Sequence, residues 1–229
     1  MRWIQKNNEP TQLQEWRSRY GSDINFDYQL MRQDHNVTNV VKESLLQEQG
    51  WLCAYTGRRI ESNSCHIEHV KAQAHCERGE DVQYTNLVAC YPAPNTVEAP
   101  YGAHQKKDWP SPSERSFFVS PLDQGCEARF TFSLKGNINP TNSTDTATEQ
   151  TIKRLKLCHR DLVALRKSAI QELLGQTNNL PIDKARRRLN GLERQTSGRL
   201  EPFCFVLVQV LRKHISRLEG IRNNRRGSR

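Results

Sequence analysis

The apolar residues between Trp51 and about Ala93 fall in short segments, and this pattern limits the fold more than any other feature of the sequence. The segments WLCAYT, HIEHV and NLVACY are separated by polar turns, and no long periodic run joins them. Short runs of this kind predict small strands within an irregular α+β segment. A large sheet or a long helix is not expected in this part of the chain.

Helical patterns precede this segment. Residues 10–19 begin with Pro-Thr and are followed by a glycine stop, which predicts a short helix. Residues 37–50 predict a second helix, with Thr38 as a candidate cap and Gly50 at its end. Two helices are therefore expected before the first strand.

The last part of the chain is expected to be mostly helical. From Ala147 to Gly175 apolar residues recur near a period of 3.6. Further helices are predicted at 182–194 and 203–218, although the β-branched run FCFVLVQV in the latter also fits a strand. The final residues, RNNRRGSR, are typical of a frayed basic tail.

Loops and a hairpin connect these parts. Residues 92–116 are rich in Pro, Ser and Asn and are expected to be mostly loop around a short ordered piece near His104. Phe130, Phe132 and Leu134 alternate on one face before a Lys-Gly turn, which predicts a β-hairpin. The expected organisation is N-terminal helices at 1–50, a core at 51–110, a loop and hairpin at 111–145, and a helical region with a basic tail at 146–229.

Charge and cysteine content narrow the functional classes. Lys and Arg total 34 against 25 acidic residues, a formal net charge of +9, which favours a polyanionic partner without requiring one. No segment has the apolar length of a signal peptide or a membrane span, so we expect a soluble cytoplasmic protein with no membrane partner. Seven cysteines in a reducing compartment are best interpreted as buried thiols or metal ligands.

Candidate catalytic residues occur in three pieces, SCHIEHVKAQAH, YTNLVACY and YGAHQKKDW. Hydrolysis of a phosphodiester needs a base for water, a cation for the developing charge, and a group that orients the base. His69 suits the base because its ordinary pKa is near neutrality. Glu68 and His104 could hold a divalent metal, and Lys107, one helical turn after His104, could reach a phosphate.

The neighbouring residues Glu68 and His69 raise a geometric conflict. In a regular strand they point to opposite faces, so both serve one site only if the strand ends or bends there. His66 shares the face of Glu68 and is a competing ligand.

The order Glu-His, then Asn86, then His-x-x-Lys resembles the HNH endonucleases. With the start MRWIQKNNEP, the segment LCAYTG and the later TIKRLKLCHRDLVALR, the chain is similar to the HNH proteins of retron and Septu anti-phage systems, the PtuB-like group. The resemblance implies an α+β fold with a small ββα-metal nuclease core at 51–110. It also implies that Asn86 fixes the loop or the imidazole of His69.

The same resemblance implies cofactors and partners. The metal would be Mg or Mn, with Ni or Zn as other possibilities, and the substrate DNA or RNA. The expected partners are an ABC-type ATPase of the PtuA-like kind, and a reverse transcriptase with its RNA-linked DNA. The chain departs from many relatives because CAYT stands where they carry Cys-x-x-Cys, so Cys53 and Cys90 each lack a nearby second cysteine and a structural zinc is not expected.

Other interpretations of these features remain open. The chain could be a non-catalytic nucleic-acid-binding module, or an adaptor that docks the ATPase. His75 and Cys76 could bind metal with Cys65 and His66, although the spacing matches no standard zinc site. The basic stretch at 185–199 could bind nucleic acid, dock a partner, or be a solvated helix face.

Overall fold

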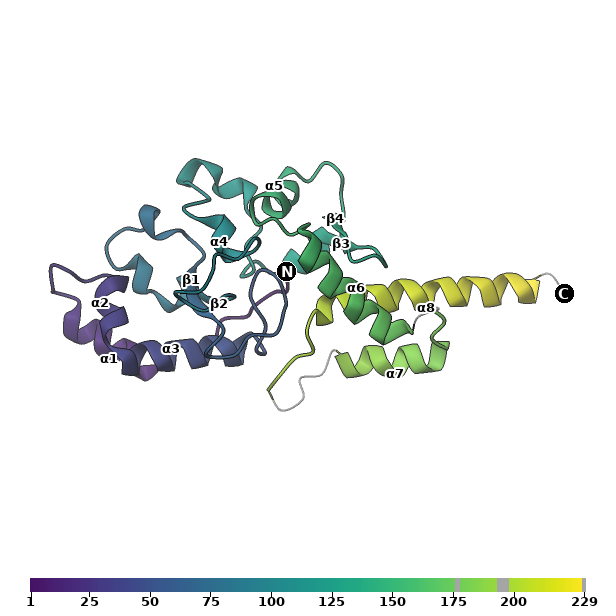
Figure 1. Cartoon of the computed structure of the whole chain (residues 1–229), viewed down its shortest axis with the longest axis horizontal. Helices are drawn as coiled ribbons and strands as arrows, with labels where there is room; N and C mark the ends of the chain where they lie inside the picture. Colours follow the sequence, from purple (N-terminus) through teal and green to yellow (C-terminus); the bar gives the residue numbers. More distant parts are fainter. Residues whose placement is uncertain (176–177, 193–197, 228–229) are drawn as a thin grey trace.

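The computed structural model describes residues 1–175, 178–192 and 198–227. The chain is mainly helical, with two small two-stranded sheets, β1–β2 and β3–β4 (Figure 1). This agrees with the broad α+β expectation. The short 3₁₀ turns in the loops are η1 Gln73–His75, η2 Glu80–Val82, η3 Tyr84–Asn86, η4 Pro112–Phe117 and η5 Cys126–Arg129.

The helices before the first sheet are α1 Thr11–Tyr20, α2 Tyr28–Gln33 and α3 His35–Glu48. The prediction of α1 and α3 is confirmed, but the cap of α3 was wrong. The Asp34 carboxylate accepts from the amides of Asn36 and Val37, so α3 begins before Thr38, which lies inside the helix. α2 was not predicted because fewer than two turns leave no measurable period.

The first sheet pairs β1 His66–His69 with β2 Leu87–Cys90 in antiparallel register. The short helix α4, Ala103–Lys106, follows. HIEHV and NLVACY therefore contain strands, as predicted. WLCAYT does not, because Leu52 forms only an isolated bridge with Arg59 across the tight turn at Gly57.

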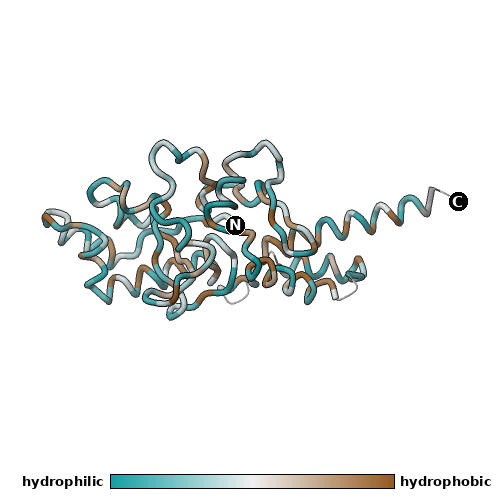
Figure 2. Tube along the Cα trace, turned by 45° about the horizontal axis from the view of Figure 1, so that its top comes forward, coloured by the Kyte–Doolittle hydropathy of each residue, from teal (hydrophilic) through white to brown (hydrophobic). Residues whose placement is uncertain are grey.

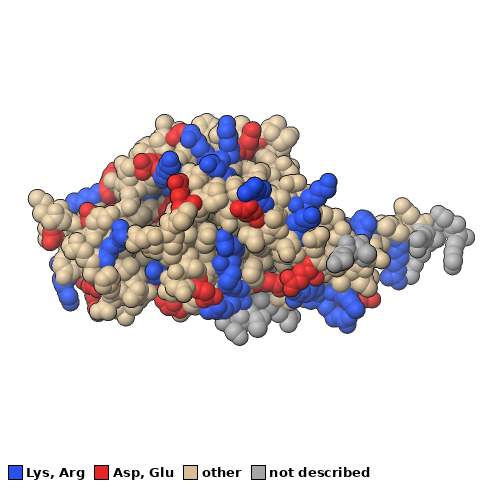
Figure 3. Space-filling view, in the orientation of Figure 1, with Lys and Arg blue, Asp and Glu red and all other residues tan. Residues whose placement is uncertain are grey.

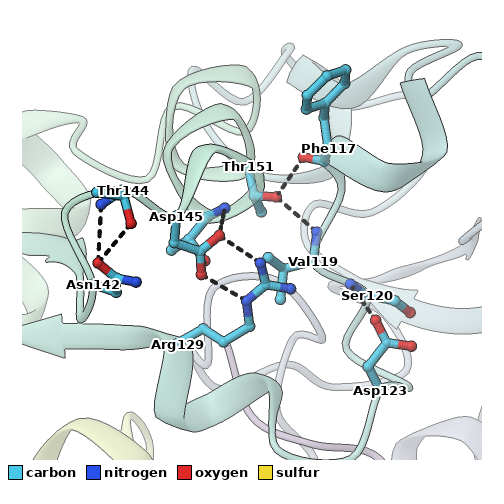
Figure 4. Close-up of polar contacts among 10 residues, drawn as sticks. Phe117, Val119, Ser120, Asp123, Arg129, Asn142, Thr144, Asp145 and Thr151 are labelled. Atoms are coloured by element: carbon cyan, nitrogen blue, oxygen red, sulfur yellow. Dashed lines mark hydrogen bonds and ion pairs between the residues drawn. The ribbon is translucent and has the colours of Figure 1, made fainter. Parts of the chain in front are cut away.

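The second sheet is the predicted hairpin, β3 Phe130–Phe132 with β4 Ile138–Pro140. Figure 4 shows what anchors it: the Arg129 guanidinium donates twice to the Asp145 carboxylate, at 2.8 and 2.5 Å. The same carboxylate accepts from the amide of Thr148 and so caps α5. Leu134 was expected to share the buried face, but it lies in the turn and is 50% exposed.

The helical stretch after Ala147 is two helices, α5 Thr146–Arg154 and α6 Arg160–Leu174. Lys156 between them has φ +47°, and the Leu157 amide donates to the Ile152 carbonyl, as in a Schellman motif. The apolar period continues across this break because Leu155 and Leu157 are both buried in the turn. The sequence offers no glycine to mark it.

The last helices are α7 Ile182–Leu192 and α8 Cys204–Gly227. FCFVLVQV is helical from Cys204 onward, and α8 continues into the stretch predicted to be a frayed tail. Residues 193 and 194, predicted to end the preceding helix, and residues 228 and 229 lie outside the described part of the chain.

One hydrophobic core connects these elements. It extends in sequence from Met1 to Ile215, and Figure 2 shows brown segments spread through the body of the molecule. Among the described residues, no helix combines the length and the apolar character that crossing a membrane requires.

Candidate active site

Side chains alternate along β1 between a half-buried and a buried face. His66 and Glu68 share the more open face, whereas Ile67 and His69 point toward the core. The conflict expected from the sequence is therefore real. Glu68 and His69 leave the strand on opposite sides, at the point where β1 ends.

The open face of β1 carries a cluster formed by His66, Glu68 and His104. His66 Nε2 lies 3.5 Å from a carboxylate oxygen of Glu68, and the two imidazole centroids are 5.4 Å apart. Burial opposes ionisation of Glu68, but the hydrogen bond from His66 and the charge of Lys106 outweigh it and hold the pKa of Glu68 below its ordinary value. The cluster thus contains an ionised carboxylate beside two imidazoles.

Lys106 is a buried cation next to this cluster. Its Nζ donates to the main-chain oxygen of His69 at 2.8 Å and lies 3.2 Å from Oε1 of Glu68. The side chain is only 1% exposed. The ammonium therefore connects the two candidate residues that leave β1 on opposite faces. It also stands where it opposes the approach of another cation to Glu68.

The His69 imidazole is held on the core side of β1. Its Nε2 lies 2.9 Å from the main-chain oxygen of Asp81, and the ring packs edge-on against Tyr28 with centroids 4.5 Å apart. A carbonyl only accepts, so Nε2 carries the hydrogen and Nδ1 holds the free lone pair. Burial lowers the pKa of His69, which favours this neutral form. His69 is 5% exposed, so water reaches Nδ1 only after local movement.

Asn86 closes the loop between β1 and β2. Its Oδ1 accepts from the Lys71 amide at 2.7 Å, and its Nδ2 donates to the carbonyls of Lys71 and Glu80 at 3.2 and 3.4 Å. Glu80 directly precedes Asp81, whose carbonyl faces His69. Asn86 does not touch the imidazole itself and acts on it through the loop.

His104 and Lys107 differ from the expected geometry. The His104 Nδ1 accepts from the Ala99 amide at 3.0 Å, so this imidazole can bind a metal only after that bond is released. α4 ends at Lys106, and Lys107 follows with φ +50° and an exposed side chain. The expectation that Lys107 lies on the helix was wrong, because the backbone turns after Lys106.

The fit of a divalent metal can be judged from these donors. Within the described residues, no three His, Cys, Asp or Glu side chains converge as a ready ligand set. Glu68 and the Nε2 atom of His66 nevertheless face each other, and carboxylate and imidazole are suitable ligands for such ions. The donor chemistry therefore fits a metal, provided that His66 loses a proton at Nε2 and His104 is released from Ala99.

The cysteines form no paired zinc site among the described residues. Cys53 and Cys90, which lack partners in sequence, are close in the structure: burial raises the pKa of Cys53, but its neighbours, Cys90 among them, lower it to about 5. His75 contacts the Asp108 carbonyl at 2.9 Å, and Cys76 lies 3.5 Å from Nδ2 of Asn86. The alternative metal cluster of His75 and Cys76 with Cys65 and His66 does not come together in the part of the chain that the structure describes.

A cavity of about 720 Å³ opens on the Asn86 side of the site. Its lining includes Lys71 and Glu80 from the loop between the strands, and Arg115 and Asp123 from the segment after α4. Acidic and basic side chains both line the cavity, but Glu68 and His104 do not. The cavity is therefore separate from the His66–Glu68–His104 cluster.

Three further site residues escaped sequence reasoning. Asp81 acts through its carbonyl, which every residue type carries, and Tyr28 is far from His69 in sequence. Lys106 was visible beside Lys107, but only the end of α4 decides which of the two lysines points inward.

Comparison with known proteins gives a distant relation. The sequence matches no protein-family model. It is 24% identical, over 181 residues, to a protein of Vibrio cholerae serotype O1 biovar El Tor described as a candidate HNH endonuclease of retron Vc95. The similarity covers 75% of this chain and 83% of that protein. The chain is thus a distant relative of a candidate retron nuclease over most of its length.

Proposed function

We propose that this protein is a metal-dependent HNH endonuclease that hydrolyses phosphodiester bonds of DNA or RNA. The observation that carries the proposal is the β1–β2–α4 sequence of elements, with Glu68 and His104 beside β1 and His69 at its end. The distant similarity to the retron Vc95 protein supports the same activity. In this proposal residues 51–110 form the ββα-metal core.

The residues have separate roles in the proposed reaction. His69 takes a proton from water at Nδ1, and the Asp81 carbonyl holds its tautomer. Glu68 and His104 would hold the cation, with His66 as a further donor. A bound divalent cation would stabilise the negative charge on phosphate and leaving oxygen. Lys107, with its exposed side chain, contacts a phosphate.

Access to His69 gives the proposal a regulatory step. The imidazole is 5% exposed and the Lys106 ammonium already neutralises Glu68, so the arrangement described is a resting one. Substrate or a partner must open the core side of β1 before water meets Nδ1. An isolated protein with little activity would agree with this account.

The proposed setting is anti-phage defence, in which this chain is the effector. The retron association of the relative supports it. The proposed partners are an ABC-type ATPase, and a reverse transcriptase with its RNA-linked DNA.

The test is cleavage of labelled plasmid, single-stranded DNA, duplex DNA and total tRNA by the full chain. Each substrate is incubated with Mg, with Mn and with EDTA, in the presence and absence of the proposed ABC-type ATPase partner. We expect at least one substrate to be cut in Mg or Mn and none in EDTA. Cutting that persists in EDTA would contradict the metal-dependent mechanism.

A second candidate function is a non-catalytic nucleic-acid-binding module or an adaptor for the ATPase. The observation that favours it is the Lys106 ammonium, which lies 3.2 Å from Glu68, one of the two proposed metal ligands. Such a protein would cut no substrate in any metal. The module would bind nucleic acid by itself, whereas the adaptor would bind the ATPase and little nucleic acid.

A further inference from the structure

The net charge of this protein is confined to one end of the chain. Residues 1–175 contain 21 Lys and Arg residues and 21 Asp and Glu residues, so they are neutral overall. Residues 176–229 contain 13 basic and 4 acidic residues, and this difference equals the whole formal charge of +9. The part that holds the proposed active site therefore has no net attraction for a polyanion.

The basic part forms an extension of the body. We define the C-terminal arm as α7 together with α8 from Arg212 onward. α8 is fixed in the core by buried side chains such as Val206 and Leu207, and it continues past the end of α7 (Figure 1). Arg186 of α7 pairs with Glu219 of α8 at 2.6 Å, which joins the two helices. Figure 3 shows blue side chains along the arm with some red beside them, and blue and red interspersed on the body.

Some basic side chains of the arm pair with other residues of the protein, and others do not. Arg186 and Arg188 form ion pairs with glutamates, and Lys213 donates to the β3 strand. Lys184, Arg187 and Arg222 are exposed and have no hydrogen-bond or ion-pair partner among the residues that the structure describes. Lys184 and Arg187 are three residues apart in α7 and so lie on one face.

The composition of the arm distinguishes between possible polyanions. Eight of the ten basic residues of the arm are arginines, whose planar guanidinium matches phosphate oxygens in two-point contacts. A helix that lies on a membrane needs an apolar face, and a protein interface needs apolar anchors. Among the described residues of the arm, Ile221 is the one exposed large hydrophobic side chain. A phosphate backbone fits this surface better than a membrane or an acidic protein.

We propose that the C-terminal arm is a nucleic-acid docking surface that binds the phosphate backbone and delivers the strand to the neutral body. That the bound strand is also the substrate rests on the proposed nuclease function. The docking itself does not, because it needs neither metal nor His69.

The test compares two charge-reversal variants of the full chain. The arm variant is Lys184→Glu, Arg187→Glu and Arg222→Glu. The control is Lys135→Glu, Lys153→Glu and Lys167→Glu, which makes the same change in net charge on exposed body lysines without partners among the described residues. Binding of fluorescein-labelled duplex DNA, and of an RNA–DNA hybrid, is followed by fluorescence anisotropy in EDTA across a salt series.

We expect the arm variant to bind at least tenfold more weakly at about 0.1 M salt and to lose about 2 to 3 from the slope of log Kd against log salt. The control should change affinity less than twofold. Equal weakening in both variants, or unchanged binding in the arm variant, would overturn the proposal. The corresponding Gln variants replace the Glu variants if the thermal melts show a loss of folding.

This experiment separates the arm from the active site. If the arm variant binds more weakly but the protein cuts no substrate, the docking proposal is retained and the nuclease proposal is rejected. If the protein cuts nucleic acid but the arm variant binds it as tightly as the wild type does, the nuclease function is retained and the docking surface is rejected.

Discussion

At the scale of single residues, the site depends on groups that the sequence shows and on others that only the fold supplies. His69 and Glu68 could be proposed from the sequence because catalysis restricts which residue types can act, and Asn86 from the resemblance to HNH endonucleases; their roles stay predictions. The main-chain oxygen of Asp81 could not be proposed, since carbonyls carry no sequence signal. The inward position of Lys106 could not either, because it depends on where α4 ends and on how the helix lies against β1.

Lys106 gives a prediction about metal affinity. Lys106→Gln keeps a donor for the His69 carbonyl and removes the ammonium that lies 3.2 Å from Glu68. Because an internal cation no longer opposes the metal, we expect Mn²⁺ to bind about tenfold more tightly, roughly 1.4 kcal/mol. Isothermal titration calorimetry of the full chain measures the dissociation constant of Mn²⁺, with Lys107→Gln as the control. Unchanged or weaker binding in Lys106→Gln would show that Lys106 does not compete with the metal.

Asn86 gives a prediction about the loop between β1 and β2. Asn86→Ala removes one acceptor and two donors to the main chain, so we expect a loss of about 1–3 kcal/mol of unfolding free energy. Hydrogen exchange should become faster at residues 71–81. Gln83→Ala, in an exposed position of the same loop, should leave both unchanged. Normal exchange in Asn86→Ala would mean that the loop is held by other contacts.

At the scale of elements, the predictions were correct where the physical signal is local. Strands β1 and β2, the β3–β4 hairpin and most long helices follow from apolar period and turn residues. The break between α5 and α6 does not, because Leu155 and Leu157 keep the helical period while the chain turns at Lys156. The strand alternative for 203–210 lost to a helix whose Val206, Leu207 and Val210 are buried in the core.

The turn at Lys156 gives a stability prediction. A lysine at φ +47° is strained, and glycine is not, so Lys156→Gly should raise the unfolding free energy by about 0.5–1 kcal/mol. Lys153→Gly, inside α5, should lower it by about 1 kcal/mol. Urea unfolding of the two variants measures the difference. A loss of stability in Lys156→Gly would indicate that the lysine side chain stabilises the turn.

At the scale of the whole molecule, residues near both ends of the chain pack against the segment that holds the candidate site. Tyr28 from α2 packs against His69, and the Leu200 and Phe203 amides donate to the carbonyls of Gly50 and Gly57. Such long-range contacts leave no trace in a single sequence. Activity is therefore to be measured on the full chain.

The measurement that tests the central claim most directly is the single-turnover cleavage rate of His69→Ala on the substrate that the wild type cuts fastest. We predict a fall of about 100- to 10,000-fold, because the base is lost. His35→Ala, at an exposed histidine outside the site, should cut at the wild-type rate. His69→Gln, which retains a donor for the Asp81 carbonyl, replaces the alanine variant if the latter does not fold. A folded His69 variant that cuts within threefold of wild type would contradict the mechanism.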